Sequence, residues 1–266
     1  MSELPYSTEG FTRHETQVNG VRHVWWDIGA ENPGSDSCVY FHGGGTFHGF
    51  EWARDWAADV RMILPHHPNF GESADAEFGS VDDYMAHYRR FFAAIGLDRF
   101  RLVGASMGGH FASTYAARNP SQIEKLVLVS PGGLHHPDAP MPDFASIPPE
   151  DHRLIFAADA DWIEPFWPAH PGPDWMALRM REATAAFRVR ADPEATYATL
   201  LRDLATLKVP TLLVWGEADR MLPLPLLGEW LIRIPHAQSV VIPGGSHLLL
   251  DEFPAARAAA LDFLMA

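Results

Sequence analysis

The 266-residue chain contains 47% hydrophobic and 20% charged residues and carries a formal net charge of −14 at pH 7. This composition is that of an ordinary globular protein, and the length fits one large domain or one domain with an insertion. The acidic balance argues against nucleic acid and anionic membranes as partners, because both require a concentrated basic surface.

The single cysteine, Cys38, lies in an apolar stretch and is expected to be a buried, unreactive thiol. One cysteine forms no intrachain disulfide, which fits a reducing compartment. The first residues show no basic segment followed by an apolar run, and no window reaches the roughly 18 apolar residues of a membrane span. We therefore expect a cytoplasmic protein.

The chain opens with a predicted antiparallel hairpin. Residues 14–28 alternate apolar and polar side chains around Asn19-Gly20, a dipeptide that favours a tight turn. A loop over 29–37 should follow. The continuous apolar run 38–41 then predicts a buried central strand.

Strands and helices are predicted to alternate after that run. Apolar stretches at 60–64 and 126–129 predict further buried strands, and Ser80 with Asp83 three residues later predicts a helix start. Such alternation implies right-handed crossovers and a mostly parallel sheet, in which the loops after the strands share one edge.

The alternation is interrupted between residues 134 and 205, where prolines cluster and helical segments follow without a strand signal. We predict a helical cap over 134–205, inserted after the sixth strand, and a core formed by 1–133 and 206–266. Strands are again predicted at 210–216 and 239–242. The large apolar side chains of the cap predict an apolar binding pocket.

Residues 101–110 read as a buried strand, a sharp turn and a helix start, with Ser106 on the turn. The pattern Gly104-x-Ser106-x-Gly108 in this context is typical of a nucleophile elbow. Glycines on either side leave room for a strained turn from which the serine Oγ projects.

A serine hydroxyl needs a base within hydrogen-bond reach and a carboxylate that fixes the tautomer of that base. The chain order Ser106, Asp219, His247 is the order that accompanies this kind of elbow, and all three residues follow predicted strands. Glu217, two residues before Asp219, remains an alternative acid on the same loop.

Two backbone N–H groups are predicted to stabilise the oxyanion of a tetrahedral intermediate, each worth roughly 3 kcal/mol. One belongs to Met107, which follows the serine, and the other most simply to Gly44 in a glycine-rich loop. The neighbours His42, Gly43 and Gly45 are expected to contact substrate.

Three further residues are expected to bind substrate. These are Trp162 and Trp167 in the predicted cap and Leu248, which follows the candidate histidine. By contrast, Asp251 and Glu252 are expected to be solvated at the start of the last helix.

The sequence offers no convincing metal site. His66-His67 and His135-His136 are adjacent pairs, and neighbouring residues on a strand point to opposite faces. Neither glycine cluster carries the lysine of a phosphate-binding loop. The chemistry predicted for the serine needs no cofactor.

Taken together, these residues resemble the α/β-hydrolase family over the whole chain. The matching segments are the oxyanion loop at 42–45, a PGFGxS-like loop at 68–73, the elbow at 104–109, the acid loop at 216–219, and His247 with Glu252 and Pro254 downstream. The resemblance implies an α/β fold with a mostly parallel eight-stranded sheet flanked by helices, and it favours Asp219 over Glu217 as the acid.

Within that family the chain is similar to a capped branch of carboxylesterases, lactonases, perhydrolases and hydrolases that cleave carbon–carbon bonds of aromatic ring-fission products. The carbon–carbon hydrolases usually carry asparagine before the serine and tryptophan after the histidine, where this chain has Ala105 and Leu248. Basic cap residues such as Arg179 and Arg190 are candidates for holding a substrate carboxylate.

The leading hypothesis is an esterase or lactonase that acts on a small to medium apolar substrate through an acyl-enzyme on Ser106. Carbon–carbon bond hydrolysis is the second hypothesis, and a ligand receptor without turnover is the third. The expected partner is a small molecule, and the sequence leaves open whether the chain forms a homodimer.

Overall fold

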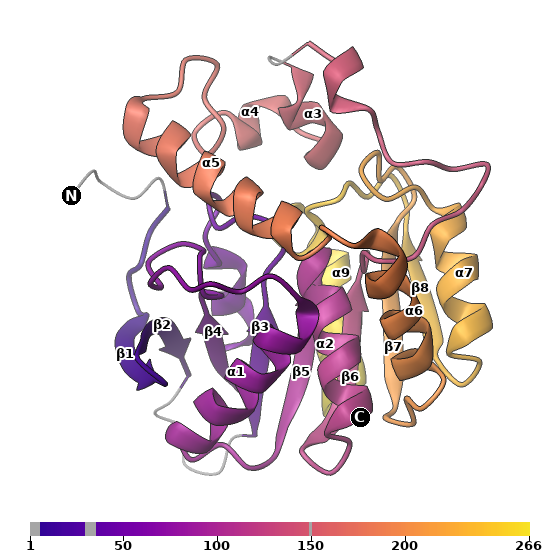
Figure 1. Ribbon diagram of the computed structural model, residues 1–266. Coiled ribbons are helices and arrows are strands. Elements are labelled where there is room, and N and C mark those ends of the chain that lie inside the picture. The colour runs from indigo at the N-terminus through magenta and orange to yellow at the C-terminus, as the bar shows by residue number, and fades with distance from the viewer. Residues whose placement is uncertain (1–5, 30–35, 149–150) are drawn as a thin grey trace.

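The computed structural model describes residues 6–29, 36–148 and 151–266. Its eight strands form one sheet in the order β1-β2-β4-β3-β5-β6-β7-β8 (Figure 1). The strands are β1 (Thr12–Val18), β2 (Val21–Ile28), β3 (Ser37–Phe41), β4 (Arg61–Pro65), β5 (Phe100–Ala105), β6 (Ile123–Val129), β7 (Thr211–Gly216) and β8 (Gln238–Ile242). Strand β2 is antiparallel to β1 and β4, and the remaining pairs are parallel. The predicted sheet is therefore confirmed, whereas most of the loop expected over 29–37 lies outside the described residues.

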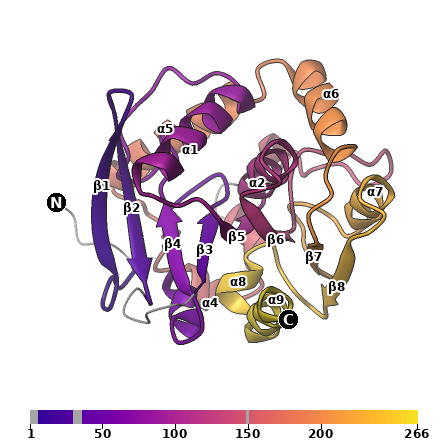
Figure 2. The same ribbon diagram turned by 90° about the horizontal axis from the view of Figure 1, so that it is seen from below.

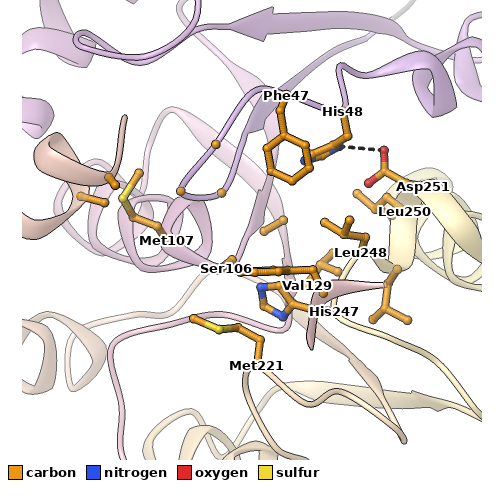
Figure 3. A pocket seen from close by; sticks show the side chains of 18 of the residues that line it. Phe47, His48, Ser106, Met107, Val129, Met221, His247, Leu248, Leu250 and Asp251 are labelled. Atoms are coloured by element: carbon orange, nitrogen blue, oxygen red, sulfur yellow. Dashed lines mark hydrogen bonds and ion pairs between the residues drawn. The ribbon is translucent and has the colours of Figure 1, made fainter. Parts of the chain in front are cut away.

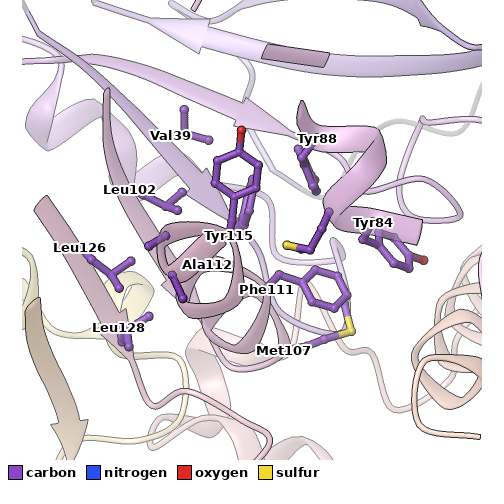
Figure 4. Close-up of a cluster of buried hydrophobic side chains, with 14 of the residues drawn as sticks. Val39, Tyr84, Tyr88, Leu102, Met107, Phe111, Ala112, Tyr115, Leu126 and Leu128 are labelled. Carbon is purple, nitrogen blue, oxygen red and sulfur yellow. The ribbon is translucent and has the colours of Figure 1, made fainter. Parts of the chain in front are cut away.

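Helices cover both faces of the sheet (Figure 2). One layer contains α1 (Val81–Ala94), α2 (Met107–Arg118), α6 (Pro193–Leu204) and α7 (Pro225–Arg233), and the other contains the 3₁₀ helix η1 (Glu51–Trp56), α8 (Leu249–Glu252) and α9 (Pro254–Met265). Successive strand residues point to opposite faces, so Val39 and Phe41 join the core under α1 and α2 while Cys38 and Tyr40 join the core under α9. Figure 4 shows the first of these cores.

Local sequence signals explain two of the boundaries. Asn19 and Gly20, in the turn between β1 and β2, have φ angles of 50° and 79°, as a tight hairpin turn requires. Ser80 accepts the N–H of Asp83 and the Asp83 side chain accepts the N–H of Ser80, which is the capping box expected at the start of α1.

Between β6 and β7 the chain forms η2 (Phe144–Ser146), α3 (Arg153–Phe156), α4 (Ala160–Ile163), α5 (Pro173–Arg188) and α6. Helices α3, α4 and α5 lie above the carboxyl ends of the parallel strands (Figure 1). Helix α6 instead packs beside α2 and buries Leu200 and Leu204 in the sheet core. Of the predicted cap, helices α3, α4 and α5 therefore lie over the strand ends, whereas α6 does not.

Cys38 is completely buried on β3, as expected for an unreactive thiol. Burial raises the pKa of Cys38 to about 12, so the thiol stays protonated at neutral pH. No helix in the described part of the chain has the length and apolar character needed to cross a membrane.

Candidate active site

Ser106 occupies a strained turn between β5 and α2. Its φ and ψ angles are 53° and −120°, and its N–H donates to the carbonyl of Val129 at 3.0 Å. A Cβ atom on Gly104 would collide with the carbonyl of Gly108, and a Cβ on Gly108 would collide with the carbonyl of Phe41. Both glycines are therefore required by close packing of backbone around the serine.

The histidine and the acid come from the loops after β8 and β7. Nδ1 of His247 donates to Oδ2 of Asp219 at 2.9 Å, and these side chains are 4% and 0% exposed. The other Asp219 oxygen accepts the N–H groups of Met221 and Leu222 at 2.9 and 2.8 Å. This arrangement leaves Nε2 of His247 for proton transfer. Glu217 is exposed and binds the turn after β8, so the geometry favours Asp219.

Ser106 and His247 face one cavity of about 320 Å³ (Figure 3). Its walls are largely apolar and include Phe47, Phe144, Phe156, Met221, Leu249 and Leu250. Within the described residues no hydrogen bond joins the serine and the histidine, and such bonds are commonly long until substrate is bound. The loops after β5, β7 and β8, which the chain order predicts at one edge of the sheet, therefore meet at one cavity.

The two proposed oxyanion donors lie beside the serine. Met107 is the first residue of α2, where N–H groups have no partner within the helix. In the described parts of the chain, the N–H groups of Met107 and Gly44 have no hydrogen-bond partner. A Cβ on Gly43 would lie 3.3 Å from Cβ of Ser106. The glycine loop therefore passes close to the serine, and Gly43, Gly44 and Gly45 all line the cavity.

His42 does not reach this cavity, contrary to the expectation that it contacts substrate. It is buried behind the glycine loop, where Nδ1–H donates to the carbonyl of Gly43 at 2.7 Å. Nε2 of His42 accepts the N–H of His67 at 3.0 Å. His42 therefore joins the glycine loop to the loop after β4, because both ring nitrogens are satisfied by backbone.

The two tryptophans expected to bind substrate also lie outside the cavity lining. The ring of Trp167 packs against the guanidinium of Arg179, 5.3 Å away, and Trp162 packs against Phe166. Indole rings bury a large apolar area, and here they do so in a small cluster with Phe47, Ala157 and Ile163. Leu248 lines the cavity as expected.

Asp251 is not a solvated residue at the start of the last helix. It lies on α8, its side chain is 7% exposed, and Oδ1 accepts a hydrogen bond from Nδ1 of His48 at 3.0 Å. Both residues line the cavity. No local signal in the sequence points to this pair, since acidic residues at helix starts are usually solvated.

Glu252 also forms hydrogen bonds within the protein. They link α8, which follows the loop that carries His247, to the residues after α3. The Glu252 carboxylate accepts the N–H groups of Ala158 and Asp159 at 3.0 and 2.9 Å. In addition, the carbonyl of Phe156 accepts the N–H groups of His247 and Leu248 at 3.0 and 3.1 Å. The end of α3 therefore fixes the backbone that carries His247.

Glu182 on α5 makes a second connection between the helices above the strand ends and a loop of the site. It is completely buried and accepts the N–H and Oγ–H of Thr46 at 3.2 and 2.6 Å. It also accepts the N–H of Gly71 at 3.1 Å and a hydrogen bond from Arg179 at 2.9 Å. Thr46 directly follows the glycine loop, so α5 holds that loop in place.

Replacing Glu182 with alanine is therefore expected to lower the free energy of unfolding by about 3 kcal/mol, because the partly buried Arg179 loses its counter-ion and the N–H groups of Thr46 and Gly71 lose their acceptor. Turnover should fall as well, since the glycine loop loses its anchor. Urea unfolding and steady-state kinetics check both effects. Glu194→Ala, an exposed position on α6, is the control. An alanine variant at 182 that unfolds like the parent contradicts the anchoring role.

Hydrolases that place a serine on a strand-to-helix turn are the class of enzyme that this fold and site define. The chain belongs to the alpha/beta hydrolase family, whose family model matches residues 38–261. The resemblance predicted from the sequence motifs is confirmed.

Individual relatives are distant. The chain is 27% identical to a 2-hydroxy-6-oxo-6-phenylhexa-2,4-dienoate hydrolase from Burkholderia cepacia, over 93% of each chain. Among solved structures, the enzyme of the same name from Rhodococcus sp. strain RHA1 has a TM-score of 0.76 at 18% identity, covering 96% of this chain and 99% of that one. A putative lipase from Acinetobacter baumannii has a TM-score of 0.74 at 19% identity, covering 96% of this chain and 91% of that one.

Proposed function

We propose that this hydrolase cleaves a carboxylic ester or lactone of a small to medium apolar substrate through an acyl-enzyme on Ser106. The observation that carries the proposal is the His247–Asp219 pair, joined at 2.9 Å, whose histidine lines the cavity that Ser106 faces. A serine on a strained turn beside a histidine of fixed tautomer is the arrangement that acyl transfer requires.

In the proposed reaction, Oγ of Ser106 attacks the ester carbonyl while Nε2 of His247 takes the hydroxyl proton. The N–H groups of Met107 and Gly44 hold the resulting oxyanion. Collapse of the intermediate releases the alcohol, which receives the proton from His247. Water then attacks the acyl-enzyme by the same steps and releases the acid.

The cavity supports the proposed substrate class. Its volume of about 320 Å³ is near the lower end of the range for ligand sites. Its walls are mainly aliphatic and aromatic side chains, so an apolar acyl or alcohol portion gains free energy on entering it. We propose that η2 to α5 act as a cap over this site and that the protein is cytoplasmic.

A fluorophosphonate is expected to add once to the protein, at Ser106, as measured by intact mass and peptide mapping. The activated serine displaces fluoride from phosphorus only when His247 removes its proton, so His247→Gln should suppress labelling. A panel of nitrophenyl esters of increasing chain length should then show a maximum of turnover. The absence of an adduct would contradict the esterase proposal and favour a receptor without turnover.

A second candidate function is carbon–carbon bond hydrolysis, which Arg190 favours. Arg190 lines the cavity and has no ion-pair partner within the described residues. A substrate carboxylate would satisfy its guanidinium, and the substrate in the Burkholderia relative's name is a dienoate. Loss of the visible absorbance of such a dienoate on mixing, abolished by Arg190→Gln, would support this candidate over simple ester hydrolysis.

A further inference from the structure

The cavity contains a second polar cluster that the proposed triad does not use. It consists of Tyr40 on β3, His48 after the glycine loop that follows β3, and Asp251 on α8, which is distant from both in sequence. Nδ1 of His48 lies 3.0 Å from Oδ1 of Asp251 (Figure 3), and the two side chains are 6% and 7% exposed. We refer to these three residues as the second cluster.

The hydrogen bond to Asp251 fixes the proton of His48. A carboxylate only accepts, so Nδ1 carries a proton in this hydrogen bond, and Nε2 is the ring nitrogen that remains for a ligand. In the part of the chain that is described, Nε2 of His48 has no hydrogen-bond partner. His48 therefore brings an unused ring nitrogen to the cavity wall.

Tyr40 brings an unused hydroxyl to the same wall. It is 3% exposed and lines the cavity, and its hydroxyl has no hydrogen-bond partner within the described residues. Burial, and then the charge of Asp251, hold the pKa of Tyr40 well above its usual value. The hydroxyl thus stays protonated at neutral pH and both donates and accepts hydrogen bonds.

Two polar groups without protein partners on the wall of a largely apolar cavity point to a polar group on the ligand, because a few placed polar groups fix the orientation of a ligand in such a site. A carboxylate is disfavoured by the negative charge of Asp251. An ammonium group is disfavoured by Arg190, which lines the same cavity and has no ion-pair partner among the described residues, whereas the charge of Arg179 is paired with Glu182. A neutral hydroxyl both donates and accepts, so it fits Nε2 of His48 and the hydroxyl of Tyr40 in either role.

We propose that the second cluster is a subsite for a hydroxyl group of the substrate, carried on a portion of the molecule away from the scissile carbonyl. This inference rests on the proposed ester hydrolysis and narrows its substrate to hydroxylated esters or lactones. The role is specificity, since the cluster contains no serine or cysteine nucleophile and His247 already serves Ser106.

Two matched pairs of esters test the subsite and distinguish the acyl portion from the alcohol portion. The first pair is 4-nitrophenyl hexanoate and its 6-hydroxy derivative, and the second is hexyl acetate and 6-hydroxyhexyl acetate. We expect kcat/KM to be at least about tenfold higher for the hydroxylated member of one pair. Equal values within both pairs would overturn the proposal.

Substitutions in the second cluster test whether the preference for hydroxylated esters comes from these residues. Tyr40→Phe and His48→Phe should bring the ratio of the two kcat/KM values toward one. The matched control is His14→Gln, because His14 pairs with Asp27 at the same 3.0 Å but lies on the β1–β2 hairpin. A cluster variant that lowers kcat/KM for both esters equally, with the ratio kept, would show a structural role and overturn the proposal.

Binding to the Ser106→Ala variant separates this inference from the proposed function. Calorimetry should show hexan-1-ol binding several-fold more tightly than 1-fluorohexane, which lacks the hydroxyl, with the difference lost in the double variant that also carries His48→Phe. Failure of every ester to react would contradict ester hydrolysis alone. Equal affinities for the two compounds would overturn the subsite whatever the reaction is.

Discussion

Replacement of Ser106 by alanine is expected to lower kcat by more than about 10⁴-fold, because no other group at the elbow can form the acyl-enzyme. The fold should persist, since alanine keeps the Cβ and loses only the hydroxyl. Steady-state kinetics and urea unfolding measure the two quantities. The matched control is Ser113→Ala on α2, whose hydroxyl donates to the carbonyl of His110 at 2.9 Å.

A glycine at the same position provides a sharper test of the elbow. The angles φ 53° and ψ −120° are unfavourable for any residue with a Cβ, so Ser106→Gly should be more stable than Ser106→Ala by about 1 kcal/mol. Both variants should be inactive. An alanine variant that still cleaves an ester of the parent would refute the assignment of Ser106.

The second large effect concerns stability in acid. Burial lowers the pKa of a set of histidines: to about 4 for His66, His87 and His110, to about 3 for His67, and well below the usual value for His23 and His42. In the unfolded chain these groups bind protons below about pH 6.5. The folded protein does not, so stability present above pH 6.5 is lost as the pH falls toward 4.

Each such histidine lowers the free energy of unfolding by about 1.4 kcal/mol for every pH unit between about pH 6.5 and 4. Two of them acting fully remove about 3 kcal/mol per unit, against a typical total stability of about 5–15 kcal/mol. We therefore expect cooperative unfolding between about pH 6 and 4. The free energy of unfolding, measured in urea across this range, gives the slope.

One buried histidine can be removed without breaking a side-chain hydrogen bond. Nε2 of His110 is buried and unpaired in the described chain, so His110→Leu should reduce the slope by about 1.4 kcal/mol per pH unit. His170→Gln, at an exposed position, should leave the slope unchanged. A stability that stays flat from pH 7 to 4.5 would contradict the buried neutral state of these histidines.

The parts of the fold that the sequence predicted are those governed by local chemistry. The turn at Asn19-Gly20 needs positive φ angles, the capping box needs Ser80 and Asp83, and the elbow needs glycines two residues either side of Ser106. Each requirement is met by residues close together in the chain. The order of strands then places Asp219 and His247 on the same edge, so the geometry of the proposed triad follows from the topology.

The interactions that the sequence did not predict join distant segments through packing. Glu182 meets Thr46 only because α5 crosses above the glycine loop, and Asp251 meets His48 only because α8 turns toward the same loop. Neither acid lies in a local sequence pattern that distinguishes it from an exposed carboxylate. The tryptophans of the predicted cap were likewise assigned to substrate because their spacing does not reveal which neighbour they pack against.

The carbonyl of Phe156 accepts hydrogen bonds from the N–H groups of His247 and Leu248. These hydrogen bonds limit how this enzyme can be re-engineered. A chimera that joined this sheet to the covering helices of a distant relative would retain Ser106 and Asp219. It would nevertheless lose the acceptor that holds the histidine loop, unless the grafted helices supplied a carbonyl at the same point. Covering helices and sheet are therefore not interchangeable modules, and substrate range in this chain is better altered by single substitutions than by exchanging the whole segment.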